Sequence, residues 1–336
     1  MKTSSGLNRI NPLTYNLSLA GFFVLVVVLI GLFLFATKQI DYTWRWYKMP
    51  GYFYSDKTYD VNVEIDGIVE NITSNKDQIS ILVKGKKSSE TYAMPQSGKI
   101  LISKGDTVYS GDTLGEYKEW HLGLLGTGIL ITLKVSIYSS IIGIIIGIIG
   151  GIARISSNPA LKWASIVYIE LIRGSPLLVQ IFIWYFVFAT IINGMLMHAG
   201  FHEISAMWYG IAALSTFAGA YVTEIVRSGI ESINIGQIEA SRSLGMTSAQ
   251  CMYYIVLPQA IRRILPPLAG QFITLIKDSS LLGIIAVREL TKATREGITT
   301  SLQPYEFWFV CAILYLVLTF TLSMCVQYLE RRMQTP

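Results

Sequence analysis

The sequence predicts a mainly α-helical, polytopic membrane protein with six transmembrane helices and one small all-β domain. Of its 336 residues, 52% are hydrophobic and only 15% are charged, whereas a soluble domain of this size normally has about a quarter charged residues. The charged residues are also unevenly distributed. Long runs with few or no charges surround one segment, residues 57–119, that is rich in charges of both signs.

The first transmembrane span is predicted at residues 15–37. Residues 10–37 contain no charged side chain, and their apolar centre at residues 21–36 suits a helix that crosses about 30 Å of hydrocarbon. The run is long for a signal-peptide core and lacks a small-residue cleavage site, so we expect a retained span. Residues 1–14 then form a cytoplasmic N-terminus. The Trp and Tyr residues within 42–54 suit the headgroup region that follows a span.

Residues 57–119 predict an extracytoplasmic β domain, because short alternating runs are separated there by Gly, Asn, Asp and Ser turns. Residues 94–117 resemble the half-repeat of lipoyl- and biotinyl-carrier barrel-sandwich domains. The resemblance rests on Gly98, on the turns Gly105-Asp106 and Gly111-Asp112, and on Leu114. The hairpin that presents a modified lysine is missing. We therefore expect an unmodified, structural module.

Five further spans are predicted near residues 125–153, 177–197, 208–226, 265–287 and 307–328. Basic residues favour the cytoplasmic side of a membrane protein. This tendency places Arg154, Lys162 and Arg331–Arg332 in the cytoplasm. Counting back through six spans puts both termini in the cytoplasm and the β domain outside. The number of spans therefore agrees with the positions of the basic residues.

Several kinds of chemistry lack their motifs in this chain. There is no Cys-x-x-Cys and no Walker-type phosphate loop, so we expect neither a disulfide scaffold nor an ATP site. His198 and His202 fall in a predicted outer loop and are interpreted as solvated, not as metal ligands. No basic arm suits nucleic acid. We expect no catalytic residue and no cofactor here; any ATP and magnesium must bind another chain.

The stretch from Gly236 to Pro258 is too polar to cross a bilayer. Its first residues predict a short helix that Gly245 ends with a left-handed cap, and residues 247–250 form a capping-box pattern that starts a second helix. Pro258 should end or kink that helix. Ala240 and Ser241 are small, so another protein could approach closely there. The local pattern alone is equally compatible with an ordinary interhelical loop.

This stretch also matches a long, specific motif, E-A-A-x3-G-x9-I-x-L-P. The matching residues are Glu239, Ala240, Ser241, Gly245, Ile255, Leu257 and Pro258, with Ser at 241 in place of Ala. The motif resembles the cytoplasmic signature of ABC-importer permease subunits. Residues 126–140, 168–182, 220–233 and 257–281 are similar to the polar amino acid branch of that family (histidine, glutamine, arginine and opine permeases).

The resemblance covers residues 121–334 and implies a five-span type I importer permease with a cytoplasmic coupling loop at 228–263. It implies a bacterial cytoplasmic-membrane subunit, not itself an enzyme, that imports polar amino acids with ATP energy. The helix at 239–245 would dock into a cytoplasmic ATPase dimer, which binds ATP and magnesium. A second permease subunit (a copy or a paralogue) and an extracytoplasmic amino-acid-binding protein are the other expected partners.

Two sets of polar residues interrupt the apolar spans. Lys277, Asp278, Ser279 and Ser280 fall in the outer half of a span when counted at about 1.5 Å per residue. They either form a local Lys–Asp pair or contact the substrate. Glu224 lies three residues before Arg227. It either pairs with that arginine or lines the substrate pathway.

Two other classes of function are compatible with a polytopic chain. A secondary transporter or channel would need no cytoplasmic docking loop. An envelope adaptor that works through its β domain would need only one anchoring span. For the β domain itself, we expect a role in positioning the binding protein or bracing the outer gate.

Overall fold

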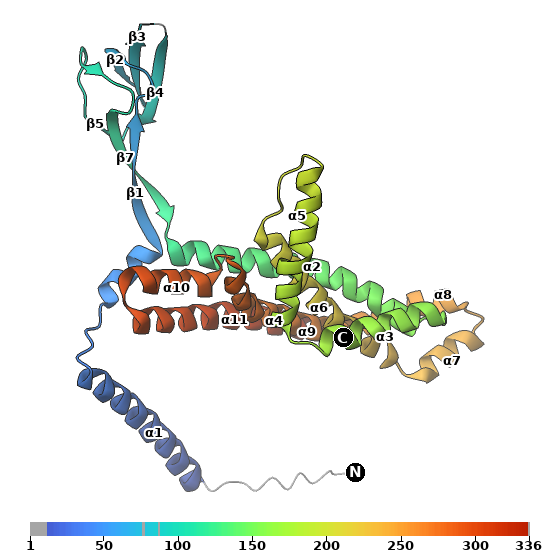
Figure 1. The fold of residues 1–336 in the computed structure, drawn as a ribbon. Helices are drawn as coiled ribbons and strands as arrows, with labels where there is room; N and C mark the ends of the chain where they lie inside the picture. Colours follow the sequence, from blue (N-terminus) through green and yellow to red (C-terminus); the bar gives the residue numbers. More distant parts are fainter. Residues whose placement is uncertain (1–11, 76–77, 87, 335–336) are drawn as a thin grey trace. The chain divides into compact units, whose positions relative to one another are not determined.

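The computed structural model describes residues 12–75, 78–86 and 88–334 (Figure 1). The chain divides into two compact units, Met1–Trp46 and Tyr47–Pro336, and each is described by itself. Residues 1–11 of the predicted cytoplasmic N-terminus lie outside the described residues. The side chains of Arg331 and Arg332 are not described either.

The first unit is one apolar helix followed by an aromatic cluster. Helix α1 (Pro12–Gln39) contains a candidate span at Leu17–Gln39, as predicted. Its apolar side chains stay exposed within the unit, as expected of a helix whose surroundings are hydrocarbon. After the helix, Trp44 stacks on Trp46 with ring centroids 5.5 Å apart. Tyr42 meets Trp44 edge-on at 5.3 Å.

The second unit contains the β domain and a helical core. The core elements are α2 (Leu124–Ile155), α3 (Pro159–Arg173), α4 (Leu177–Phe182), the π-helix η2 (Ile183–Phe188), α5 (Ala189–His198), α6 (Ala206–Glu231), α7 (Ile235–Ser243), α8 (Ser248–Cys251), the π-helix η3 (Met252–Val256), α9 (Leu257–Asp278), the 3-10 helix η4 (Ser279–Ile285), α10 (Leu290–Ser301) and α11 (Pro304–Gln334). With α1, the described residues provide six helices long and apolar enough to cross a membrane. The prediction of six spans is confirmed.

Two helices of the core were not expected from the sequence. Helix α3 begins in the connection between the spans predicted at 125–153 and 177–197, because Asn158 caps it by accepting a hydrogen bond from the Ala160 N–H at 2.9 Å. Pro159 follows at the first helical position, where its missing N–H costs nothing. Helix α10 follows η4. The span predicted at residues 265–287 is the second half of a longer helical segment, Ser248–Ile285.

Helices α2 and α6 pack very closely because one face of α2 has glycine at every fourth position. Gly143, Gly147 and Gly151 are buried against α6. A Cβ atom at Gly147 would lie 2.3 Å from the Cβ of Val222, closer than any real contact. Small residues at this spacing let two helix backbones approach in a membrane.

The β domain is built from seven strands in two sheets. The strands are β1 (Tyr54–Asn62), β2 (Gly67–Ser74), β3 (Gln78–Gly85), β4 (Ser89–Pro95), β5 (Lys99–Ile100), β6 (Thr107–Val108) and β7 (Thr113–Leu122). One sheet has the order β1-β7-β5 and the other β4-β3-β2-β6. Val69, Ile81 and Val83 from the second sheet share a buried core with Leu114 of the first, so the sheets form one module.

The module is joined to the helical core without a flexible linker. Strands β1 and β7 pair antiparallel from Tyr54↔Leu122 onward, and only Gly123 separates β7 from α2. Just before β1, the 3-10 helix η1 (Trp46–Tyr52) contacts the core. The Tyr52 ring meets Phe307 edge-on at 4.7 Å. The β domain therefore joins α2 at its first turn, about 48 Å along the helix axis from its last.

Candidate functional site

The polar stretch folds as helix, stop, helix, as predicted. Asn234 caps α7 by accepting a hydrogen bond from the Gly236 N–H at 2.8 Å. Gly245 follows the helix in the left-handed conformation with φ +83°. The Met246 N–H then donates to the Ser241 carbonyl and the Gly245 N–H donates to the Arg242 carbonyl. These two bonds form a Schellman motif, which satisfies carbonyls that a helix end leaves free.

The second helix begins with the predicted capping box. The Thr247 Oγ1 accepts a hydrogen bond from the Gln250 N–H at 3.2 Å, and the Gln250 Oε1 accepts one from the Thr247 N–H at 2.8 Å. Between the two helices, an Arg242 Nη1–H donates to the Ser248 Oγ at 2.8 Å. The loop is therefore held in one geometry by its own hydrogen bonds.

One face of α7 packs inward, and it includes a residue that we expected on the docking surface. Ser241 is buried, its hydroxyl donates to the Ile238 carbonyl at 2.8 Å, and its Oγ lies 2.8 Å from the Cys251 Sγ. Ile238 packs against the cluster that contains Val256 and Ile264. The expectation that Ser241 meets another protein was wrong: the residue must be small because α8 packs against it.

Pro258 does not end the second helix. The chain passes from α8 through the π-helix η3 into α9, and Pro258 lies in the first turn of α9. Proline lacks an N–H and clashes with the carbonyl four residues earlier, and the wider π turn just before it accommodates that clash. Ile255 is half-buried, whereas Leu257 and Pro258 are exposed. Of the two expected outcomes, an end or a kink, the end is not seen, because the helix changes type at this position instead of stopping.

The opposite face of α7 is free among the described residues. Glu239 and Ala240 are exposed there, and Leu244, at the helix end, is 84% exposed. An exposed leucine and an exposed carboxylate on one rigid, capped helix are suited to contact with another protein. The motif does not include Leu244, so sequence reasoning missed it. The sequence did contain one indication of its role: Leu244 lies between Ser243 and Gly245, directly before the predicted helix cap.

Glu224 belongs to an ion-pair cluster at the same end of the core. Its carboxylate accepts hydrogen bonds from Arg227 Nε at 2.9 Å and Nη2 at 2.7 Å, and it lies 3.8 Å from the Arg154 Nε on α2. Arg227 also pairs with Glu231. The intrahelical alternative for Glu224 is therefore present, with a contact to α2 that the sequence did not predict. The structure does not bring Glu224 together with residues 277–280.

Residues 277–280 mark the change from α9 to the 3-10 helix η4. Ser279 is buried and donates a hydrogen bond to the Ile276 carbonyl. Among the described residues neither Lys277 nor Asp278 forms an ion pair with its charged atoms within 4.0 Å of a partner. Lys277 and Ser280 instead line a pocket of about 280 Å³, together with Thr291, Trp308, Cys311, Ala312 and Tyr315.

A buried glutamate supports one wall of this pocket, and it was not predicted. Glu289 is fully buried and caps α10, accepting 2.7 Å hydrogen bonds from the N–H groups of Thr291 and Lys292. The Tyr315 hydroxyl donates to the same carboxylate at 2.9 Å. Burial raises the pKa of the Glu289 carboxyl, and these hydrogen bonds oppose that rise. Glutamate is an uncommon N-cap, so the sequence contained only a weak signal.

Comparison with known families finds a match for most of the helical core. Residues 143–335 match the family described as binding-protein-dependent transport system inner membrane component. This range includes the polar loop, the residues at 277–280 and Glu289, and it begins after the first span and the β domain.

Similar proteins extend that match. The probable glutamine ABC transporter permease protein GlnP of Bacillus subtilis (strain 168) is 38% identical over 224 residues, which are 66% of this chain and 99% of the relative. The glutamine transport system permease protein GlnP of Escherichia coli (strain K12) is 36% identical over 211 residues, 63% of this chain and 93% of the relative. A crystal structure of an amino acid ABC transporter with histidines superposes with a TM-score of 0.55 at 37% identity, covering 62% of this chain and 94% of that one.

Proposed function

The chain belongs to the family of binding-protein-dependent transport system inner membrane components, and we propose that it is the transmembrane permease subunit of an ATP-driven importer for polar amino acids. The observation that supports this most directly is the loop at 236–258. It has the family motif, and it folds as a rigid, capped helix with an exposed docking face. The first span and the β domain are additions to the architecture that the relatives share.

The loop would couple transport to a separate ATPase. Glu239 lies in the exposed part of α7, where its carboxylate is available to a basic residue of the partner. Leu244 supplies an exposed apolar side chain at the end of the helix, and Ala240 allows close approach. Because α7 packs on α8 and α9 through Ile238 and Ser241, a displacement of the docked helix would be transmitted to α9 as a rigid body.

The substrate would pass the change in helix type at residues 277–280. The pocket there combines one cation, Lys277, with hydroxyl groups from Ser280, Thr291 and Tyr315. A cation with nearby hydroxyls suits the carboxylate of an amino acid, and broken helices are where transporters expose such groups. Asp278 and Ser279 do not line this pocket and would act by shaping the backbone. We assign Glu224 to the ion-pair cluster.

The remaining partners follow from this role. ATP and magnesium would bind to the cytoplasmic ATPase dimer, and this chain would be neither an enzyme nor a cofactor carrier. A second permease subunit and an amino-acid-binding protein would complete the importer in a bacterial cytoplasmic membrane. The loop at 236–258 would face the cytoplasm, as would both termini.

The test is reconstitution with the ATPase that co-purifies under mild detergent. Candidate amino acids are screened with the binding protein for stimulated ATP hydrolysis and uptake. The substitution Glu239→Lys reverses the charge on the docking face. We expect ATP hydrolysis to persist while amino acid uptake falls by an order of magnitude or more. The physical reason is the lost contact with the ATPase, because breaking a close charge pair at an interface costs about 2–5 kcal/mol.

The matched control is Glu203→Lys, which reverses an exposed carboxylate just before the start of α6, at the opposite end of that helix from α7. It should retain most uptake, because it leaves α7 unchanged. Normal uptake by Glu239→Lys would refute the role of this loop. If no ATPase co-purifies and a proton gradient alone drives uptake, the chain is a secondary transporter.

A further inference from the structure

Helix α10 has two unlike faces. One face is buried in the helical core and consists of Leu290, Ala293, Thr294 and Gly297. The other face borders a cavity of about 470 Å³, together with the last part of η4. The residues that line this cavity are Gly283, Ile284, Lys292, Arg295, Glu296 and Thr299. The helix therefore presents a polar, mainly charged face to the cavity.

Helix α10 lies beside the membrane-spanning helices, although it is not a candidate span itself. The Leu290 N–H donates a hydrogen bond to the Thr132 Oγ1 at 3.1 Å, and Thr132 lies about two turns inside the candidate span on α2. The Thr291 Oγ1 lies 3.0 Å from the hydroxyl oxygen of Tyr315, which is near the middle of the candidate span on α11. Figure 1 shows α10 alongside α11. The start of α10 is therefore at membrane depth.

The cations on the polar face outnumber the carboxylates. Arg288, just before the helix, pairs with Glu296 at 3.2 Å. Lys292 and Arg295 have no ion-pair partner within 4.0 Å among the described residues. The nearby Glu289 carboxylate is buried and accepts backbone hydrogen bonds. Even when Glu289 is counted, one positive charge remains in excess.

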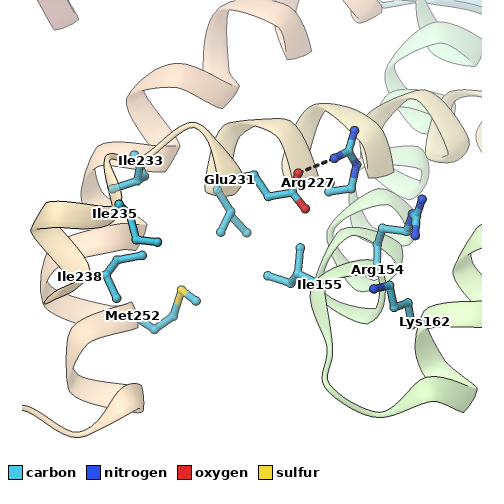
Figure 2. A pocket seen from close by; sticks show the side chains of 10 residues that line it. Arg154, Ile155, Lys162, Arg227, Glu231, Ile233, Ile235, Ile238 and Met252 are labelled. Atoms are coloured by element: carbon cyan, nitrogen blue, oxygen red, sulfur yellow. Dashed lines mark hydrogen bonds and ion pairs between the residues drawn. The ribbon is translucent and has the colours of Figure 1, made fainter. Parts of the chain in front are cut away.

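An arginine at the other end of the core shows the alternative arrangement. Figure 2 shows Arg227 paired with Glu231, and Arg227 also binds the Glu224 carboxylate. Charged side chains at membrane depth are costly unless they face one another or a water-filled cavity. Lys292 and Arg295 lack the first arrangement, so their face of α10 must border water. Through η4, this face continues from the residues at 277–280.

On the basis of the permease role proposed above, we propose that the polar face of α10 lines the outer part of the translocation pathway and that its excess positive charge favours amino acids with an acidic side chain. A cavity lined by one sign of charge raises the local concentration of ions of the opposite sign. An acidic amino acid has one net negative charge at neutral pH, whereas an amide such as glutamine has none. The substrate class is thereby narrowed to acidic amino acids.

Charge distinguishes substrates here that size does not. Glutamate and glutamine have nearly the same shape, so a neutral wall would pass both at similar rates. Lys292 and Arg295 attract the side chain of glutamate and repel that of a cationic amino acid. An acidic segment of another protein would have to reach the depth of Thr132 and Tyr315 to meet this face, whereas a free amino acid needs only the cavity.

The first experiment measures the electrostatic potential in the cavity and does not require transport. In the purified full-length chain in lipid nanodiscs, the exposed Cys325 is replaced by serine and the exposed Thr299 by cysteine. Two methanethiosulfonates of similar size, one with a sulfonate and one with a trimethylammonium group, react with this thiol. Each rate is divided by the rate for a free thiol in solution. The sulfonate reagent should then react faster.

Arg295→Gln should lower the ratio of these two corrected rates about tenfold. One charge a helical turn away changes the two rates in opposite directions, by about threefold each. The matched control is Arg262→Gln, which removes an exposed cation on α9 that does not line the cavity. It should leave the ratio unchanged.

The second experiment measures selectivity in the reconstituted importer. Uptake of glutamate and of glutamine is compared between the parent and Arg295→Gln with the same binding protein, whose own preference cancels when the two ratios are compared. We expect the glutamate-to-glutamine ratio to fall about fivefold, which corresponds to about 1 kcal/mol for one charge about 4 Å away in water. Lys292→Gln should act in the same direction, and Arg295→Lys should retain the parent ratio.

Equal corrected rates for the two reagents at Thr299→Cys would overturn the cationic pathway. Slow reaction with both reagents would also overturn it, because another chain or lipid would then cover this face. An unchanged uptake ratio in Arg295→Gln would overturn the substrate class even if the thiol reacts as expected. Failure of the permease role itself is distinguishable, because the parent would then show no ATP-driven uptake of either amino acid.

Discussion

Gly245 determines the shape of the docking loop through one backbone angle. Its φ of +83° allows the Schellman bonds that end α7 and turn the chain toward Thr247. Glycine adopts this conformation without strain, whereas a β-branched residue does not. A Cβ atom at this position would meet no atom within 4 Å, so any effect of substitution arises from the backbone and not from crowding within the chain.

We therefore expect Gly245→Val to destabilise the loop by about 1–3 kcal/mol, the cost of the strained backbone. Uptake should fall as a result. Gly245→Asn should be tolerated, because asparagine adopts the left-handed conformation more readily. The measurement is hydrogen exchange of the amides of residues 236–250, together with transport. Exchange in the valine variant that is as slow as in the parent would show that the cap does not hold the loop.

At the scale of elements, the contact between α2 and α6 depends on the glycine face of α2. Gly143, Gly147 and Gly151 meet Ala218, Val222 and Val226 in turn. This packing brings Arg154 near Glu224 at the end of the two helices, so it also positions part of the ion-pair cluster there. A methyl group at any of these glycines would push the helices apart.

We expect Gly147→Ala to lower the stability of the purified protein by about 1–3 kcal/mol through overpacking, measured as a fall in the thermal midpoint. Gly194→Ala in α5 is the control. A Cβ there meets no atom within 4 Å, and alanine favours helix. Adding Val222→Ala to Gly147→Ala should recover part of the loss. A normal midpoint for Gly147→Ala alone would show that the close packing does not support stability.

For the whole molecule, the sidedness of the β domain and the docking loop can be measured by thiol labelling. Cys251 and Cys311 are buried, but Cys325 is exposed and must first be replaced by serine. In that background, an impermeant maleimide should label Lys86→Cys in intact cells. It should label Ser243→Cys only after the membrane is permeabilised, because three candidate spans, an odd number, separate the two positions along the chain. Labelling of Ser243→Cys in intact cells would overturn this topology.

The second whole-molecule prediction concerns the β domain. Tyr54 and Leu122 are paired neighbours at the base of β1 and β7, so residues 55–121 can be replaced by a short Gly/Ser turn. The ring contact between Tyr52 and Phe307, which joins the segment before β1 to the helical core, would remain. If the domain holds the binding protein near the permease, the binding-protein concentration for half-maximal uptake should rise about tenfold or more, as expected when a local effective concentration is lost.

ATPase assembly should not change in this deletion variant, and this separates loss of docking from loss of folding. An unchanged dependence on the binding protein would exclude the docking role. A lipoyl-sized adduct on Lys99 or Lys104, detected by intact mass, would contradict the expectation that the domain is unmodified.

Features that depend only on neighbours along the chain could be predicted from the amino-acid sequence. Hydropathy over about 20 residues identifies a span, so six spans were predicted and found. Caps act over three or four residues, so the Gly245 stop and the Thr247–Gln250 box were also predicted. The Glu224–Arg227 pair was one of two alternatives that the sequence left open. Helix α3 was missed, because its 15 residues are too few for a membrane span and fall between two predicted spans.

Which helix faces pack against each other became clear only from the three-dimensional fold. Ser241 is buried because Cys251 packs against it, and Glu289 is stabilised by Tyr315, which is 26 residues away. Arg154 approaches Glu224 because the glycines of α2 let α6 come close. These partners are separated along the chain, and no local pattern specifies which helices will pack together. Burial of apolar and small surfaces, summed over the helical core, makes that choice.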